Sequence, residues 1–193
     1  MGYNTIKSDK GFTVIEVIIS TAILLVMVLS IYTFFVSGLF SSLKGENKSR
    51  AVQIVRFAMD GELTNPRNPG LIDELRRAGK ITLADEDSIN FDITDTSGVT
   101  INTIDYSYLE PVSLATTASI QRADTQGSAV IADHILHPDG LQFTYFDGNG
   151  DTLAFPIGDP SVIRQIQVEI KTDINGDGQP DAVLTTKVAP RNL

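Results

Sequence analysis

An unbroken run of apolar residues near the start of the chain dominates its hydrophobic pattern. The run covers residues 12–40, and Glu16 is the single charged residue in it. As a straight helix at about 1.5 Å per residue it is roughly 43 Å long, which exceeds the roughly 30 Å hydrocarbon core of a bilayer. The pattern therefore predicts a helix that spans a membrane with tilt or extends beyond it.

Apolar residues spaced three and four apart return after residue 50. Val52, Val55 and Met59 share one helix face, so the helix is predicted to continue to about residue 63 and to cover a sheet with that face. Two prolines and a glycine within residues 65–70 end it. Residues 71–78 are predicted to form a short second helix that ends at Gly79 as its C-terminal glycine.

The pattern changes to alternation of apolar and polar residues after Lys80. The alternating segments are residues 89–94, 99–108, 118–122, 128–131, 141–145, 153–155, 166–170 and 182–188. The turns between them are of hairpin length and rich in Asp, Asn and Gly, and no helical segment separates the strands. We therefore expect an α+β fold in which the long N-terminal helix packs on an antiparallel β-sheet.

Glu16 is the exception within the apolar run. An unpaired carboxylate there costs several kcal/mol unless it finds a partner or is neutralised. Position alone leaves two interpretations open. Glu16 either lies among the lipid headgroups of a simple signal anchor, or it marks a functional site.

The residues around Glu16 favour the functional interpretation. Lys10-Gly11-Phe12-Thr13-Val14-Ile15-Glu16 resembles the prepilin peptidase site of type IV pilins and type II secretion pseudopilins. The resemblance implies that a short leader is cut after Gly11, that Phe12 becomes the N-methylated first residue, and that Glu16 stands fifth in the mature chain. A pilin-like fold is implied with it.

Physical chemistry agrees with a cleavage site placed before the apolar run. A secretory signal peptide is cut after its apolar segment, which is then lost, whereas cleavage after Gly11 keeps the helix. Glycine leaves the chain free to turn tightly into a protease. In an assembly of such helices Glu16 can accept the N-terminal ammonium of an adjacent Phe12, which offsets the cost of burying both charges.

These features divide the chain into three parts. Residues 1–11 form the leader, residues 12–40 the transmembrane and filament-core helix, and residues 41–193 one periplasmic or extracellular globular domain. Lys7 and Lys10 give the N-terminal end a small positive excess, which places it in the cytoplasm. We expect a single-pass inner-membrane protein that later joins a pilus or pseudopilus filament.

The order of segments after residue 71 carries a second resemblance. The succession LRRAG, a hairpin, IDYSY, SIQR, LQFTYFDGNG, IRQIQVEI and TTKVAPRN is similar to minor pilins and J-type minor pseudopilins. It implies a structural minor subunit that helps a filament to initiate or assemble, with other pilins or pseudopilins, prepilin peptidase and the inner membrane as partners. The alternatives are a filament-borne adhesin or substrate-recognition subunit and, further off, a membrane-anchored periplasmic enzyme.

The amino-acid composition reduces the number of possible functions and partners. The chain has 24 acidic and 15 basic residues, a net charge of −9, and this argues against nucleic acid as a partner. It has no Cys, so its domain folds without disulfides. The sequence contains no GxSxG, Walker or HExxH motif, and His134 and His137 have no third ligand at zinc spacing, so we expect no enzymatic activity.

A turn near the C-terminus is a candidate calcium site. Its sequence from Asp173 matches the D-x-[DN]-x-[DN]-G opening of a calcium loop, in which alternating oxygens wrap the cation. The acid expected at the twelfth position is replaced by Leu184. The alternative is a hairpin turn that uses these residues because they tolerate positive φ. The candidate ligands are Asp173, Asn175, Asp177, Gln179 and Asp181.

Overall fold

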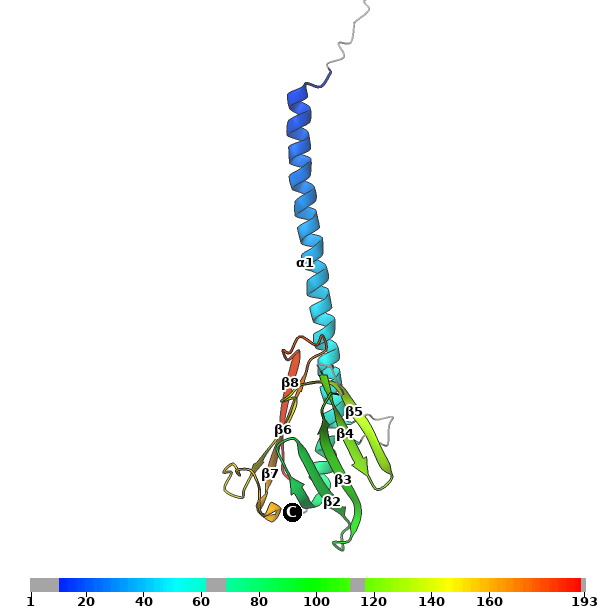
Figure 1. Ribbon diagram of the computed structural model, residues 1–193, viewed down its shortest axis with the longest axis vertical. Helices are drawn as coiled ribbons and strands as arrows, with labels where there is room; N and C mark the ends of the chain where they lie inside the picture. Colours follow the sequence, from blue (N-terminus) through cyan, green and yellow to red (C-terminus); the bar gives the residue numbers. More distant parts are fainter. Residues whose placement is uncertain (1–10, 62–68, 112–116, 192–193) are drawn as a thin grey trace, which may run out of the picture. The chain divides into compact units, whose positions relative to one another are not determined.

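The computed structural model describes residues 11–61, 69–111 and 117–191. The chain divides into two compact units, residues 1–45 and residues 46–193. One long helix, α1 (Val14–Asp60, 47 residues), contributes to both units (Figure 1).

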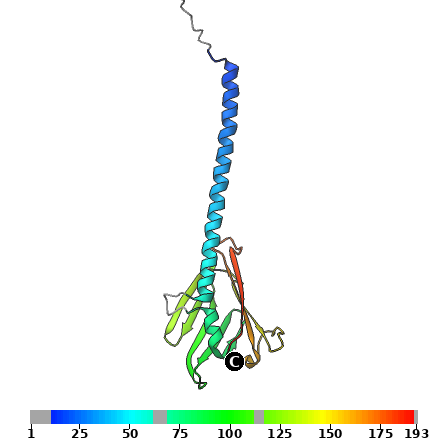
Figure 2. The same ribbon diagram turned by 180° about the vertical axis from the view of Figure 1, so that it is seen from behind.

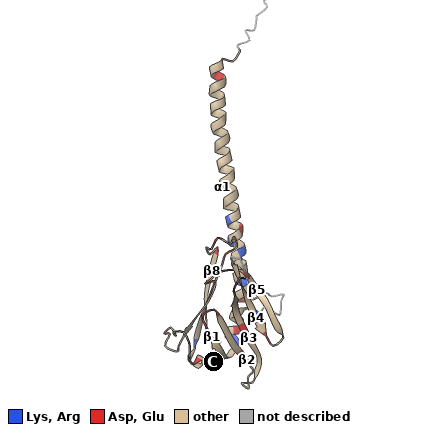
Figure 3. Ribbon diagram, in the orientation of Figure 1, with Lys and Arg blue, Asp and Glu red and all other residues tan. Residues whose placement is uncertain are grey.

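The first unit consists of the apolar part of α1. Nearly all of its side chains are exposed, including Phe34 at 83% and Ile31 at 69%. Among the described residues α1 is the helix long and apolar enough to cross a membrane. Figure 3 shows that charged residues are scarce along this part of α1 and frequent in the second unit.

The second unit combines the end of α1 with a short helix and a sheet. Its elements in chain order are α2 (Leu71–Arg77), β1 (Ala78–Ala84), β2 (Ser88–Thr94), β3 (Thr100–Leu109), β4 (Thr117–Asp124), β5 (Gly127–Leu136), β6 (Leu141–Phe146), the 3-10 helix η1 (Pro160–Val162), β7 (Gln165–Thr172) and β8 (Ala182–Val188).

Every strand pair among the described residues is antiparallel. The strand order is β1-β2-β3-β4-β5-β7-β6, and β8 pairs with β7. β5 and β7 share a single residue pair, Ile135 with Thr172, so this is where the ladder of β1 to β5 meets the ladder of β6 to β8. The predicted α+β fold with an antiparallel sheet is confirmed.

The core lies between the end of α1, the helix α2 and one face of the sheet (Figure 2). Val55, Ala58 and Met59 of α1 are at most 1% exposed. Alternate residues of the strands point into this core, as the twofold periodicity of a strand requires. The largest fully buried side chains of the strands are Tyr106, Tyr145, Phe91 and Phe143.

Two predicted helix ends differ from the observed ones. α1 ends at Asp60, and residues 62 and 63 of the predicted helix lie outside the described residues. The prediction that Gly79 ends the second helix is wrong, because α2 ends at Arg77 and Gly79 lies inside β1. A Cβ at this position would overlap the side chain of Thr94 on β2, so the glycine permits close strand packing.

The return strand predicted at residues 153–155 is also wrong. β6 leads into a turn at Asp147, after which an isolated bridge joins Phe146 to Thr152. Pro156 and Pro160 follow and lack the N–H group that a ladder needs. Leu153 nevertheless packs against the core, which explains its apolar character.

Candidate functional site

Thr13 and Glu16 form a capping box at the start of α1. The Glu16 Oε2 atom accepts hydrogen bonds from the Thr13 backbone N–H and hydroxyl, both at 3.0 Å. In return the Glu16 backbone N–H donates to the Thr13 Oγ1 atom at 3.3 Å. Such reciprocal bonds satisfy donors that a helix N-terminus otherwise leaves open. Glu16 is therefore held by its own chain at the first turn of the helix.

The capping box leaves the second oxygen of Glu16 for another partner. Among the hydrogen bonds of the described residues, both that this carboxylate accepts end on Oε2. Each carboxylate oxygen has about two acceptor sites. The group can therefore keep its bonds to Thr13 and still accept an ammonium from a second chain.

Gly11 and Phe12 lie just before this helix start. Phe12 is 85% exposed, and a Cβ added at Gly11 would meet no atom of the described residues within 4 Å. Packing against residues 12–61, 69–111 and 117–191 therefore does not explain why residue 11 is glycine. The geometry tests neither the cleavage after Gly11 nor the methylation of Phe12, so both stay predictions.

A comparison with known families identifies the motif at the start of the chain. Residues 6–32 match the family described as the prokaryotic N-terminal methylation motif. The match covers the N-terminal motif alone, and it supports the resemblance of this segment to type IV pilins and pseudopilins. Searches of curated proteins and of solved structures found no match to the chain.

The motif also has consequences for how this pilin-like chain matures. It implies processing by prepilin peptidase and assembly with other pilins. The motif and the exposed apolar helix together fit a prepilin that is anchored in the inner membrane and later assembled into a filament. Members of the superfamily are typically structural proteins.

The candidate calcium turn of the domain is organised around a buried carboxylate. Asp173 is 0% exposed, and its Oδ1 atom accepts from the backbone N–H groups of Gly176 at 2.7 Å and Asp177 at 3.2 Å. Its Oδ2 atom accepts from the N–H of Gly178 at 2.8 Å. Both glycines adopt positive φ, 70° and 77°. These bonds fold the turn around Asp173.

The other candidate ligands lie around the same turn. Asp181 Oδ2 accepts from the Ile174 N–H at 2.8 Å, and the Asn175 amide donates to Asp177 Oδ2 at 2.9 Å. Gln179 donates its N–H to Asp177 Oδ1 at 2.8 Å, which leaves its carbonyl for other partners. In the parts of the chain that the structure describes, no three His, Cys, Asp or Glu side chains are grouped to hold a metal ion. Calcium binding stays a prediction that depends on amide and carbonyl oxygens as well.

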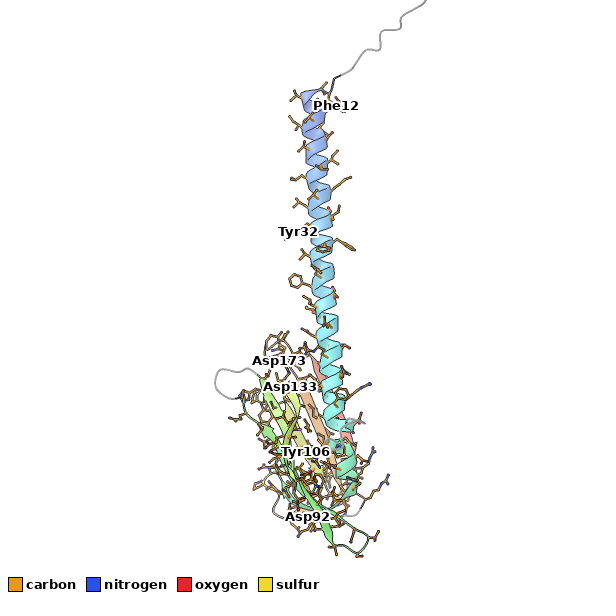
Figure 4. The ribbon with its side chains drawn as sticks, turned by 90° about the vertical axis from the view of Figure 1, so that its right-hand side faces the viewer. Phe12, Tyr32, Asp92, Tyr106, Asp133 and Asp173 are labelled. Carbon is orange, nitrogen blue, oxygen red and sulfur yellow. The ribbon has the colours of Figure 1, made fainter. Side chains whose placement is uncertain are left out.

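A buried ionic brace, formed by Glu74, Tyr106, Arg122 and Asp124 in the folded domain, was not predicted from the sequence. Glu74 of α2 is 1% exposed and receives two bonds from Arg122 of β4, from Nε at 2.9 Å and from Nη2 at 2.7 Å. The Tyr106 hydroxyl donates to the same carboxylate at 2.6 Å. Arg122 also donates to Asp124 at 2.8 Å. The brace fixes α2 to the middle of the sheet, where Figure 4 shows Tyr106.

The brace shifts the pKa of its members. Burial and the neighbouring Glu74 raise the pKa of Tyr106 well above its usual range. The hydrogen bond to Glu74 raises the pKa of Arg122, and the hydrogen bond from Arg122 lowers the pKa of Asp124. At neutral pH these shifts keep Arg122 and Asp124 charged and the Tyr106 hydroxyl neutral. A sequence signal existed, because Glu74 falls on the apolar stripe of Leu71 and Leu75.

Proposed function

We propose that this chain is a minor subunit of a type IV pilus or a type II secretion pseudopilus and that it helps the filament to initiate or assemble. The observation that carries the proposal is the methylation motif at residues 6–32, placed directly at the start of an exposed apolar helix. The helix continues into a folded domain, so cleavage before it leaves anchor and domain joined.

Maturation begins in the inner membrane. Prepilin peptidase removes residues 1–11 after Gly11, and the new N-terminal residue, Phe12, is methylated. The ammonium of Phe12 then carries a positive charge at the edge of the hydrocarbon, close to the first turn of α1. Its natural partner in an apolar medium is a carboxylate, since a charge pair offsets much of the burial cost.

Glu16 supplies that carboxylate to a neighbouring subunit. Thr13 already holds one of its oxygens, so the side chain is oriented before a partner arrives. A pre-oriented group loses less conformational freedom when it binds. The pair sets the register at which one subunit adds to the next.

The shape of the domain supports the minor-subunit part of the proposal. Its sheet has eight strands among the described residues, and the succession of those strands is the one that resembles minor pilins and J-type pseudopilins. If the chain is a minor subunit that initiates filaments, its deletion should lower the number of filaments per cell. The filaments that still form should contain the same major subunit. The turn at Asp173 is proposed as a calcium site that stabilises this domain.

The test of the proposed function is incorporation of the full chain into filaments in its native host. Sheared filaments and membranes are separated and probed for the wild type, for Glu16→Val and for Ser20→Val, a polar-to-apolar control one helical turn away. We expect Glu16→Val in the membrane fraction at the wild-type level but depleted at least about tenfold from filaments, the equivalent of about 1.4 kcal/mol. Ser20→Val should enter filaments normally. Absence of the wild-type chain from the filament fraction, or normal incorporation of Glu16→Val, would contradict the proposal.

A further inference from the structure

The long helix α1 carries its first basic residues directly where its apolar part ends. Residues 12–43 contain no Lys or Arg. Lys44, Lys48 and Arg50 then follow, all three exposed, and Figure 3 shows them as the first blue segments along the helix. Against them stands one acidic residue, Glu46, so this part of α1 carries a net charge of +2 in a chain whose net charge is −9. We call Lys44, Lys48 and Arg50 the basic belt.

The fold of the domain does not use the basic belt. Ala51, the first buried residue of α1, comes after the belt in the chain. Among the described residues, no ion pair includes a side chain of the belt. These three charges are therefore available to a partner outside the domain.

The spacing of the belt along the helix matches the thickness of one layer of lipid headgroups. A bilayer has a hydrocarbon core of about 30 Å and a total thickness of about 40–45 Å, so each headgroup layer is roughly 5–8 Å deep. From Lys44 to Lys48 the helix rises by about 6 Å. Arg50 lies about 3 Å further along, a distance that its long side chain spans. With the apolar part of α1 in the hydrocarbon, the belt lies at the level of the lipid phosphates.

The belt surrounds the helix and does not form a single stripe. Lys44 and Lys48, four positions apart, share a face. Arg50, two positions after Lys48, lies on the opposite side, at about 200° of helical rotation. A single protein partner contacts one face of a helix, whereas headgroups surround a membrane-spanning helix on every side. The arrangement therefore favours a lipid partner over an acidic face of a second protein.

We propose that the basic belt binds the headgroups of anionic phospholipids in the leaflet on the domain side of the membrane. Lys and Arg both bind phosphate oxygens, Arg through its planar fork and Lys as a compact charge. Each basic residue near an anionic membrane surface strengthens binding by about fivefold. The inference concerns the chain while it is anchored in the membrane, and it does not depend on a role in filaments.

The lipid preference around the belt is measured on the full chain in vesicles. The chain has no Cys, so Ser42→Cys, at an exposed position just before the belt, takes a single fluorophore. Vesicles of phosphatidylcholine contain the same small fraction of quencher-labelled phosphatidylglycerol in one sample and of quencher-labelled phosphatidylcholine in the other. We expect phosphatidylglycerol to be enriched around the fluorophore at least about fivefold at low salt. The enrichment should fall as sodium chloride screens the charges.

Two charge-matched double variants locate this preference. Lys44→Gln with Lys48→Gln should lower the enrichment about fivefold or more. Arg56→Gln with Lys80→Gln removes the same charge from two exposed residues outside the belt and should leave the enrichment unchanged. Arg56 lies about 9 Å beyond Arg50 along α1, which puts it outside the headgroup layer. All four side chains are exposed, so neither double variant should change the melting temperature of the domain.

Insertion of the chain into the vesicles is scored first, by its resistance to extraction with alkaline carbonate. A chain that does not insert contradicts both the membrane anchor and this inference. An inserted chain without preference for phosphatidylglycerol overturns the inference alone. The inference is also overturned if the preference survives Lys44→Gln with Lys48→Gln, or if Arg56→Gln with Lys80→Gln lowers it as much.

Inorganic phosphate separates a lipid headgroup from a free anion as the ligand. At equal ionic strength, phosphate and sodium chloride should lower the enrichment equally, because both act by screening. If phosphate is the stronger competitor, the belt recognises a free phosphate ion and the inference is overturned. Failure of the chain to enter filaments, in contrast, contradicts the proposed function and leaves the lipid contact standing.

Discussion

The structure defines most clearly which contacts are lost when Arg122 is replaced. Replacement by Met keeps an unbranched apolar stem and deletes the guanidinium that donates two bonds to Glu74 and one to Asp124. Within the described part of the chain, the Glu74 carboxylate, 1% exposed, then keeps the bond from the Tyr106 hydroxyl alone. Removing one partner of a buried ion pair typically costs about 3–5 kcal/mol, because the remaining charge is neither paired nor hydrated.

The double variant Glu74→Leu with Arg122→Met shows where that cost arises. Both charges are then gone, and the Tyr106 hydroxyl is left without its acceptor, at a cost of about 1–3 kcal/mol. We therefore expect the double variant to be more stable than Arg122→Met alone. Such a non-additive result is the signature of a coupled pair.

Urea unfolding of the full chain in detergent provides the assay. Near-ultraviolet circular dichroism reports on the buried Tyr106 and Tyr145 and hence on the packed domain. Arg164→Met is the control. Arg164 is exposed, and among the described residues its guanidinium donates to the carbonyls of Ser161 and Ile163, so the loss of this guanidinium should cost below about 1 kcal/mol. A cost for Arg122→Met below about 1 kcal/mol, or additive effects in the double variant, would refute the role of the brace.

Two further predictions concern calcium and acid. Millimolar calcium added after chelator treatment should raise the Tm of the full chain, because a ligand bound only by the folded state stabilises that state. The double variant Asp173→Ala with Asp177→Ala should show no such rise. An unchanged Tm of the wild type would mean that the turn binds no calcium. Because the hydrogen bond from Arg122 lowers the pKa of Asp124 in the folded state, its stabilising contribution is present above the unfolded pKa of about 3.9 and is lost as the pH falls through the folded value. Asp124→Asn should therefore make the Tm fall less steeply as the pH drops below about 4. If the Tm of the variant falls as steeply as that of the wild type, the contact between Arg122 and Asp124 does not contribute to stability.

The parts of the fold that were predicted correctly follow from local periodicity. Alternating residues 89–93 and 166–170 specified the inward faces of β2 and β7, since side chains alternate regardless of what lies across the sheet. β1 was missed because bulges after Ala78 and Ile81 shift its register and break the alternation. Gly79 was misassigned for a related reason, since its close neighbour Thr94 lies fifteen residues away in the chain.

The candidate sites also differ in whether their residues are adjacent in the sequence or are brought together by the fold. The segment from Gly11 to Glu16 is continuous in sequence, so its motif and its capping box could both be recognised from adjacent residues, although only the structure showed that Thr13 holds Glu16. Glu74 and Arg122 are 48 residues apart, and only the folded sheet brings them together. Glu74 on an apolar stripe indicated a buried carboxylate, but not its partner.

The central claim, that this chain is a processed filament subunit, is tested most directly by the intact mass of the chain recovered from sheared filaments. The account predicts one species that lacks residues 1–11 and carries an added methyl group on Phe12. Gly11→Ala should shift the balance toward the uncut form, because a side chain then stands at the scissile bond. Recovery of the wild-type chain with Met1 retained, or cut beyond Phe40, would contradict the account.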